Sequence, residues 1–287
     1  MNEWVERKNM IHEIAPRVMH NEFRSQFPLA TDYLFYFEGE NVLLFKNGES
    51  STLPTFENVA VDNEGLFPLA HYLFSIDETA FFLTEKKPVA LNDFFVMESA
   101  RCFRHFVEPW LGFAGATALH LWSWERVNKF CGICGEKMDR HKKERAFKCA
   151  HCENIVYSRI APVVIVAVSS GDKLLMARNL NNLIQKLFLI SGFVDVGESL
   201  EEAVVREVKE EMGIAIKNIR YITSQPWGFS NSLIAGFTAE LEGDGTLHIQ
   251  EDEIAEAAWV DRKDIPEYDP SLSISSLLIE MFRKQQS

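Results

Sequence analysis

The segment at residues 197–214, GESLEEAVVREVKEEMGI, constrains the fold more than any other part of the sequence. Ser199 followed by Glu202 has the spacing of a capping box, which predicts that a helix begins just after Ser199. Gly213 can end that helix, because glycine adopts a left-handed conformation without steric cost. At about 100° per residue, four apolar side chains share one face: Leu200, Ala203, Val204 and Val208. We therefore predict an amphipathic helix that packs on a core.

The second half of this face is acidic. Glu207, Glu210 and Glu211 continue it at spacings of three and four residues. Buried carboxylates this close together repel one another, and they would cost many kcal/mol or take up protons. Mg²⁺ and Mn²⁺ prefer oxygen ligands, so a bound cation would remove the conflict. The alternative is a solvated acidic face with Arg206 and Lys209 as partners.

The composition is that of a globular chain of 287 residues, with 47% hydrophobic and 25% charged residues. No apolar run approaches the roughly 20 residues that a membrane span needs. The first residues, MNEWVERKNMIHE, lack the apolar stretch of a signal peptide, so we expect a cytoplasmic protein without a membrane partner. The net charge of −13 argues against broad binding to nucleic acid. A phosphate-bearing substrate would need a cation between itself and the protein.

Outside the acidic helix, the sequence predicts an α+β protein. Residues 1 to about 125 contain alternating runs such as NVLLFKNG, which predict strands, and their many phenylalanines are expected to form a core. Residues 91–130 are expected to be mostly helical, with a break near Pro109. From residue 161 we expect a hairpin around Ser170 and Gly171, the acidic helix, strands with an irregular insert, a last strand in EAAWVDRKDIP, and an amphipathic helix. The order β, β, α, β, β, α is typical of an α/β/α layered domain.

Four of the five cysteines form the pattern C-x2-C-x14-C-x2-C: Cys131, Cys134, Cys149 and Cys152. Two such pairs can supply four thiolates to one tetrahedral ion, so we predict a zinc ribbon with one structural Zn²⁺ per chain. The residues between the pairs are basic: Lys137, Arg140, His141, Lys142, Lys143 and Arg145. This hairpin is either a solvated tip or a surface that contacts nucleic acid. Cys102 is expected to be a small buried residue in a helix.

Nine positions around the acidic helix match G-x5-E-x7-R-E-U-x-E-E-x-G-U, where U is aliphatic: Gly192, Glu198, Arg206, Glu207, Val208, Glu210, Glu211, Gly213 and Ile214. The segment resembles the metal-binding loop and helix of Nudix hydrolases, which cleave nucleoside diphosphates linked to another moiety. The resemblance implies that Glu207 and Glu211 bind one or more Mg²⁺ or Mn²⁺ ions and that Glu210 binds a metal or orients a water. Arg206 and Glu198 would brace the loop, and Gly192 would let the chain approach the phosphates.

A second motif, SQPWGFSNS at residues 224–232, resembles the SQPWPFPxS signature of NADH pyrophosphatases. Gly228 and Ser230 stand where that signature has its two later prolines, so we expect a less rigid loop. VYSRIAPVVIVAV and LISGFVDVGE are also similar to segments of this family. The similarity to the bacterial NADH pyrophosphatases extends from about Phe130 to about Leu278, whereas residues 1 to about 125 match only loosely.

The resemblance to NADH pyrophosphatases implies further site residues. Phe193 and Trp227, from opposite subunits of a homodimer, would sandwich a base of the dinucleotide, since flat aromatic faces suit such rings. Tyr157, Gln225 and Ser232 would contact substrate, and Glu253 would be a metal ligand outside the helix. Ser275 takes the place of a small residue near the substrate in that family.

We therefore expect three domains: an N-terminal mixed α/β domain at 1–126, a zinc ribbon at 127–156 and a Nudix α/β/α sandwich at 157–287. The resemblance implies metal-dependent hydrolysis of the pyrophosphate bond of NADH or NAD⁺ to nicotinamide mononucleotide and AMP, together with removal of NAD caps from RNA. One alternative is a Nudix hydrolase for ADP-ribose or a diadenosine polyphosphate, against which the SQPW motif argues. The other is a non-catalytic nucleotide sensor, against which the complete set of glutamates argues.

Overall fold

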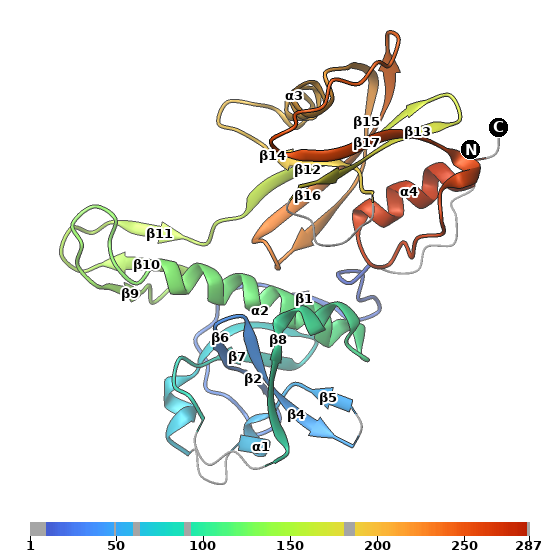
Figure 1. Ribbon diagram of the computed structural model, residues 1–287. Coiled ribbons are helices and arrows are strands. Elements are labelled where there is room, and N and C mark those ends of the chain that lie inside the picture. The colour runs from blue at the N-terminus through green and yellow to red at the C-terminus, as the bar shows by residue number, and fades with distance from the viewer. Residues whose placement is uncertain (1–9, 49, 60–63, 89–92, 181–186, 286–287) are drawn as a thin grey trace. The chain divides into compact units, whose positions relative to one another are not determined.

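A computed structural model describes the chain at residues 10–48, 50–59, 64–88, 93–180 and 187–285 (Figure 1). The chain divides into two compact units. One, which we call the ribbon unit, contains Glu13–Arg159 together with Trp227–Asn231. The other, the sandwich unit, contains Ile160–Pro226 and the chain from Ser232 onward, with residues 10–12. The three-domain division expected from the sequence stays a prediction.

Two small sheets and one long helix build the first part of the ribbon unit. One sheet has the order β1-β6-β7-β2: Met19–His20, His71–Ile76, Thr79–Leu83 and Tyr33–Phe35. The other has the order β3-β4-β5, with β8 also paired to β4: Phe37–Glu38, Asn41–Asn47, Ser50–Thr52 and Phe95–Ser99. Among the described residues of this part, the helical elements are α1, α2 and two 3₁₀ helices: Phe56–Val59, Pro109–Val127, Glu64–Leu69 and Ala100–His105. The expected aromatic core is confirmed, with Phe35, Phe74 and Phe81 fully buried in one cluster.

The expectation of helix across residues 91–130 is wrong for its first part. Residues 91 and 92 lie outside the described residues, and Phe95–Ser99 form strand β8, which pairs antiparallel with β4. This segment is a strand because it forms ladder hydrogen bonds with a strand some fifty residues earlier in the chain. Such long-range pairing cannot be predicted from a local sequence pattern. α2 begins at Pro109 itself, where proline is suited to the first turn because it lacks an N–H to satisfy. Cys102 lies in the 3₁₀ helix and is half-buried rather than buried.

The cysteine-rich segment forms a three-stranded antiparallel sheet in the order β11-β10-β9. Its strands are Ile155–Tyr157, Ala146–Cys149 and Met138–Arg140. Trp124 of α2 packs into the same small core as Met138 and Phe147. The C-terminal end of α2 and this ribbon therefore share one hydrophobic cluster within the ribbon unit.

The sandwich unit is a six-stranded sheet between two helices (Figure 1). The strand order is β15-β16-β12-β13-β17, and β14 also pairs with β12. In that order the strands are Ala215–Trp227, Ser232–Glu242, Ala161–Ser170, Lys173–Asn179 and Ile254–Asp261, with β14 at Ile190–Phe193. The helices are α3 at Leu200–Met212 and α4 at Ile274–Lys284, and a short 3₁₀ helix spans Arg262–Asp264.

Alternation along β12 separates the two layers of the sandwich. Val164 and Val166 face the cluster that includes the apolar side of α3, whereas Ile165 and Ala167 face the cluster that includes α4. The predicted α/β/α layering, hairpin at Gly171 and C-terminal helix are confirmed. The structure adds β14, which the sequence pattern missed, and β15 runs through the SQPW motif, so the irregular insert is only a short turn. Among the described residues, none of the helices combines the length and apolarity needed to cross a membrane.

Candidate active site and metal centre

The acidic helix α3 has the predicted ends. The Ser199 hydroxyl accepts a hydrogen bond from the Glu202 backbone N–H, and the Glu202 carboxylate accepts one from the Ser199 backbone N–H. Gly213 ends the helix in a left-handed conformation with a φ of 72°. Ala203, Val204 and other apolar residues of α3 are fully buried, as predicted. Caps at both ends thus fix which turn of the helix carries the glutamates.

Arg206 connects four groups around the start of α3. Its guanidinium donates to both carboxylate oxygens of Glu198, at 2.5 and 2.8 Å, and to the Phe193 carbonyl at 2.9 Å. Nη1 of this guanidinium donates to both the Glu207 carboxylate, at 2.8 Å, and the Glu210 carboxylate, at 3.1 Å. Arg206 and the backbone N–H of Asp195 lower the pKa of Glu198 to about 2. Arg206 therefore braces the loop and also holds two of the candidate ligands.

The three glutamates of α3 differ in burial. The side chains of Glu207 and Glu210 are 13% and 55% exposed, whereas Glu211 is only 5% exposed. Burial, together with the negative charges of Glu207, Glu253 and Glu210, raises the pKa of Glu211 to about 7. The alternative of a solvated face paired with Arg206 and Lys209 fits only in part. Arg206 pairs as that alternative requires, but Lys209 donates to the Gly213 carbonyl and Glu211 is buried.

An open hollow of about 540 Å³ lies beside α3. Its walls carry Arg206, Glu207, Glu210, Gln250 and Glu253. The loop that carries the last two residues is tied to the end of α3, because the Gln250 N–H donates to the Glu211 carbonyl at 3.0 Å. Glu253 N–H in turn donates to the Gln250 carbonyl. No local pattern in the sequence marks Gln250, which reaches this wall through the long-range backbone contact with α3.

Gly192 has a steric role that the sequence did not reveal. A Cβ at this position of β14 would lie 2.0 Å from Cδ of Glu207. The glycine therefore leaves room for the Glu207 carboxylate. Its expected role in approaching the phosphates stays a prediction.

The predicted substrate contacts in the sandwich unit fall into an exposed and a buried set. Phe193 is 58% exposed at the end of β14. Gln225 is fully buried, and its Oε1 accepts from the Ile274 N–H at the start of α4, at 2.9 Å. Ser232 is also buried. Among the described residues, Gln225 Nε2 and Ser275 Oγ are buried polar atoms without a hydrogen-bond partner.

The other two predicted contacts lie in the ribbon unit. Tyr157 is 53% exposed, and its hydroxyl donates to Glu144 at 3.0 Å. Trp227 is half-buried, and its ring lies 5.0 Å from that of Phe229 in an edge-on arrangement. The structure thus places the predicted site residues on both units, with the SQPW motif divided after Pro226.

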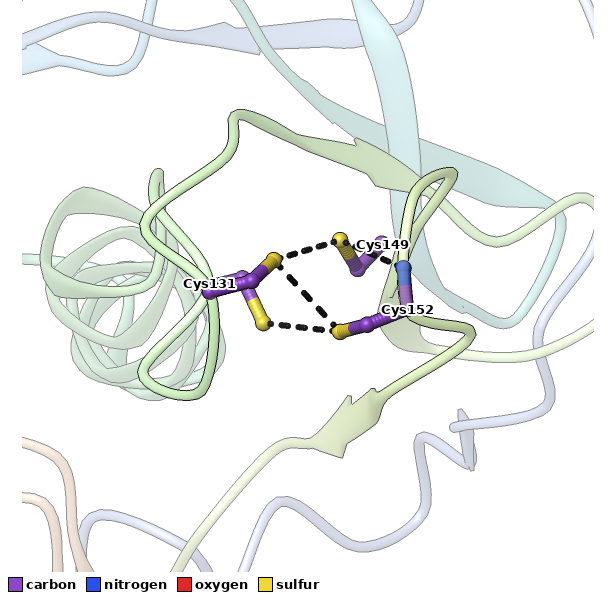
Figure 2. Close-up of side chains that lie close together, drawn as sticks. Cys131, Cys149 and Cys152 are labelled. Atoms are coloured by element: carbon purple, nitrogen blue, oxygen red, sulfur yellow. Dashed lines mark hydrogen bonds between the residues drawn. The ribbon is translucent and has the colours of Figure 1, made fainter.

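The four cysteines converge on one point, as Figure 2 shows for Cys131, Cys149 and Cys152. Neighbouring Sγ atoms are 3.5 Å apart, and all four lie within 4.8 Å of one another. A tetrahedron with Zn–S bonds of about 2.3 Å has edges of about 3.8 Å, so the spacing suits such an ion. Backbone N–H groups of Cys134 and Ile133 lower the pKa of the Cys131 thiol to about 6, whereas burial and the contact with Cys149 raise the pKa of Cys134 to about 12.

Within the described part of the chain, this is the only group of three or more possible ligands gathered so closely. Glu207 and Glu210 of α3 line the same hollow but are not drawn together to coordination distance. Arg206 holds Glu207 and Glu210, and mutual repulsion keeps unshielded carboxylates apart.

Two basic residues of the cysteine-rich hairpin have structural partners. Arg140 contacts Glu125 at 2.7 Å and Glu85 at 3.0 Å. Arg145 donates to the Leu73 carbonyl and to Asn21 Oδ1. Three lysines of the hairpin are exposed: Lys137, Lys142 and Lys143. The arginines are already engaged within the ribbon unit. This distribution therefore favours a solvated tip over a surface that contacts nucleic acid.

Comparison with known proteins identifies the fold of the sandwich unit. Residues 159–277 match the NUDIX domain family. A Salmonella typhi protein named NAD-capped RNA hydrolase NudC is 44% identical over 155 residues, which are 54% of this chain and 60% of that protein. The protein of the same name from Citrobacter koseri gives the same values. The chain thus spans about 60% of the length of these curated relatives.

A Nudix hydrolase from Nitrosomonas europaea is 19% identical and aligns with a TM-score of 0.48 over 54% of this chain and 90% of the other. The domain match, the α/β/α layers and the position of the glutamates on α3 all indicate a Nudix fold for the sandwich unit. Residues 159–277 match a NUDIX domain, and 155 residues of the chain are similar to proteins named NAD-capped RNA hydrolase NudC.

Proposed function

We propose that this protein hydrolyses the pyrophosphate bond of NADH or NAD⁺, giving nicotinamide mononucleotide and AMP, and that it removes NAD caps from RNA by cutting the same bond. The observation that carries the proposal is the acidic hollow of the Nudix domain. Glu207, Glu210 and Glu253 line it beside the buried Glu211. The names of the curated relatives and the SQPW motif favour an NAD-type substrate.

The hollow suits Mg²⁺ or Mn²⁺, because its walls offer carboxylate oxygens. Burial and the negative charges of these carboxylates raise the pKa of the adjacent Glu211 to about 7. Such ions supply charge neutralisation at the pyrophosphate and lower the pKa of an attacking water. Glu207, Glu211 and Glu253 would hold the ions. Glu210 is the most exposed of the helix glutamates, so it can bind an ion or accept a hydrogen bond from the water. Arg206 would keep the loop and helix in register through Glu198.

Substrate binding would use aromatic faces and buried polar groups. Phe193 and Trp227 offer the faces on which rings of the dinucleotide can stack. Gln225 Nε2 and Ser275 Oγ are buried without a hydrogen-bond partner among the described residues, and their contact with substrate stays a prediction. The contacts of Tyr157 and Ser232 with substrate stay predictions. The homodimer and the cytoplasmic location also stay predictions.

The cysteine cluster would hold one structural Zn²⁺ per chain. Its four sulfur atoms have tetrahedral spacing, and Cys131, Cys149 and Trp124 pack in one cluster. Zinc would therefore stabilise the end of α2 along with the ribbon. The exposed lysines of the hairpin remain available to the RNA of a capped substrate.

Incubation with NADH, ADP-ribose and NAD-capped RNA, each with Mn²⁺, tests the assignment. Metal-dependent release of AMP and reduced mononucleotide from NADH is the expected result. Cleavage of ADP-ribose alone would assign the protein to the other dinucleotide hydrolases. Tight binding of nucleotide without products would make it a sensor.

Replacement of Glu207 by Gln removes one charge from the hollow and preserves the side-chain shape. We expect kcat to fall by orders of magnitude with the fold retained, because the metal would lose a ligand. Glu201→Gln is the matched control, since Glu201 is exposed on the outer face of the same helix. Near-normal turnover in the Glu207 variant would remove the assigned ligand set.

A further inference from the structure

The loop Trp227–Asn231 is part of the ribbon unit and is held there by close packing. A Cβ on Gly228 would lie 1.9 Å from the Ala116 carbonyl oxygen of α2, so the two backbones touch. Phe229 packs against the large aromatic core of the same unit. The Trp227 ring is therefore fixed against elements of the N-terminal part of the chain, far from it in sequence.

Arg104 covers the aromatic pair of this loop. Its guanidinium carbon lies 4.8 Å from the centroid of the Trp227 ring and 5.0 Å from that of Phe229. The 3₁₀ helix Ala100–His105 presents it, anchored by the adjacent Phe103, which is 1% exposed. These distances are within the range in which a cation is attracted by an aromatic face.

The charge of Arg104 is not neutralised by a carboxylate in the part of the chain that the structure describes, since none of the ion pairs there includes it. The neighbouring charge is instead Arg101. Burial first, and then the repulsion from Arg101, lower the pKa of Arg104. The local field at Trp227 is therefore positive.

We propose that Arg104 is a specificity-determining residue that favours an uncharged ring over a cationic one at Trp227. The inference rests on the proposed function, in which a ring of the dinucleotide stacks on this tryptophan, and it takes that ring to be the nicotinamide. The oxidised nicotinamide is a pyridinium with one positive charge, whereas the reduced dihydropyridine is neutral. A guanidinium over the indole repels the first and not the second, and it also draws electron density from the face on which a cation would rest.

The size of the effect follows from Coulomb's law. A ring stacked on the other face of Trp227 would lie about 9 Å from the guanidinium, given the 4.8 Å between that group and the indole. Two unit charges at that separation repel by an energy that corresponds to roughly 2-fold in binding in bulk water and roughly 20-fold at an effective dielectric constant near 20. Arg104 thus shifts the preference toward NADH by a factor between these limits.

The test is the ratio of kcat/KM for NADH to that for NAD⁺, measured with Mn²⁺ on the full chain. In Arg104→Gln we expect this ratio to fall about 2- to 20-fold, mainly through a lower KM for NAD⁺. Arg104→Lys keeps the charge and should keep most of the ratio. Arg126→Gln is the matched control, because Arg126 lies 4.9 Å over Trp122, a ring outside the loop.

The outcomes separate this inference from the proposed function. A wild-type protein that cleaves neither dinucleotide overturns both. A wild-type protein that cleaves them, with an unchanged ratio in Arg104→Gln, overturns the inference alone. An equal change of kcat/KM for NADH and for NAD⁺ in Arg104→Gln would also overturn the inference. It would show that Arg104 has a structural role, or that the substrate ring displaces the arginine from Trp227.

Discussion

Replacing Gly192 by Ala is expected to displace a candidate metal ligand with little effect on the fold. The added Cβ would lie 2.0 Å from Cδ of Glu207, whereas carbon atoms in contact are about 3.5 Å apart. The carboxylate must therefore withdraw by about 1.5 Å. It can do so by rotating its own flexible side chain, so the strand need not move. A displacement of about 1 Å at a reacting centre can cost about 10²-fold in rate, and we expect a fall of that order in kcat.

The assay compares kcat for NADH hydrolysis with the midpoint of thermal unfolding. Gly65→Ala is the control, because a Cβ there meets only Lys86 Nζ at 3.7 Å, an ordinary contact. Gly192→Ala should lose activity and keep a Tm within a few degrees of the wild type. A variant with kcat within about twofold of the wild type would show that the position of Glu207 does not limit the reaction, and the steric argument would fail.

Three further predictions concern stability. Gly228→Ala should destabilise the ribbon unit by about 1–3 kcal/mol in urea unfolding, because its Cβ would meet the Ala116 carbonyl oxygen, a rigid backbone atom; an unchanged midpoint would contradict this. The hydrogen bonds from Arg283 lower the pKa of the buried Glu280 to about 2. The ionised Glu280 therefore stabilises the fold above pH 4.5, by at most about 3 kcal/mol. This contribution is lost as the pH falls from about 4.5 to about 2. The stability difference between wild type and Glu280→Gln should shrink over that range, and a constant difference would refute the linkage. Cys149→Ser should abolish binding of one Zn²⁺ per chain and lower the Tm of the ribbon unit, as measured by metal analysis and calorimetry; full zinc content would contradict the ligand set.

Local signals in the sequence predicted the parts of the molecule that local physics determines. The capping box at Ser199, the left-handed Gly213 and the apolar face of α3 each depend on residues within a few positions of one another, and the structure contains all three. The cysteine spacing likewise fixed the geometry of two short turns. The choice of Glu207 and Glu211 as candidate ligands came from the resemblance of this segment to Nudix hydrolases, and it stays a prediction.

Contacts between distant segments were beyond such reasoning. Residues 95–99 contain good helix formers such as Met97 and Glu98, yet they pair with β4 as a strand. Gln250 joins the acidic hollow because its backbone N–H binds the last turn of α3. Arg104 meets Trp227 across more than a hundred residues of chain.

The loop with Trp227 shows how such a contact changes the meaning of a motif. In the sequence, Gly228 is a departure from a proline-rich signature and suggests a looser loop. In the structure the same glycine permits the backbone to rest on Ala116, so the loop is held by packing instead of by proline. Rigidity can thus be supplied by a neighbouring helix where the motif itself lacks it. Because that helix lies outside residues 159–277, which match the NUDIX domain, the proposed ring recognition at Trp227 should vary with the N-terminal sequence even where the Nudix residues are unchanged.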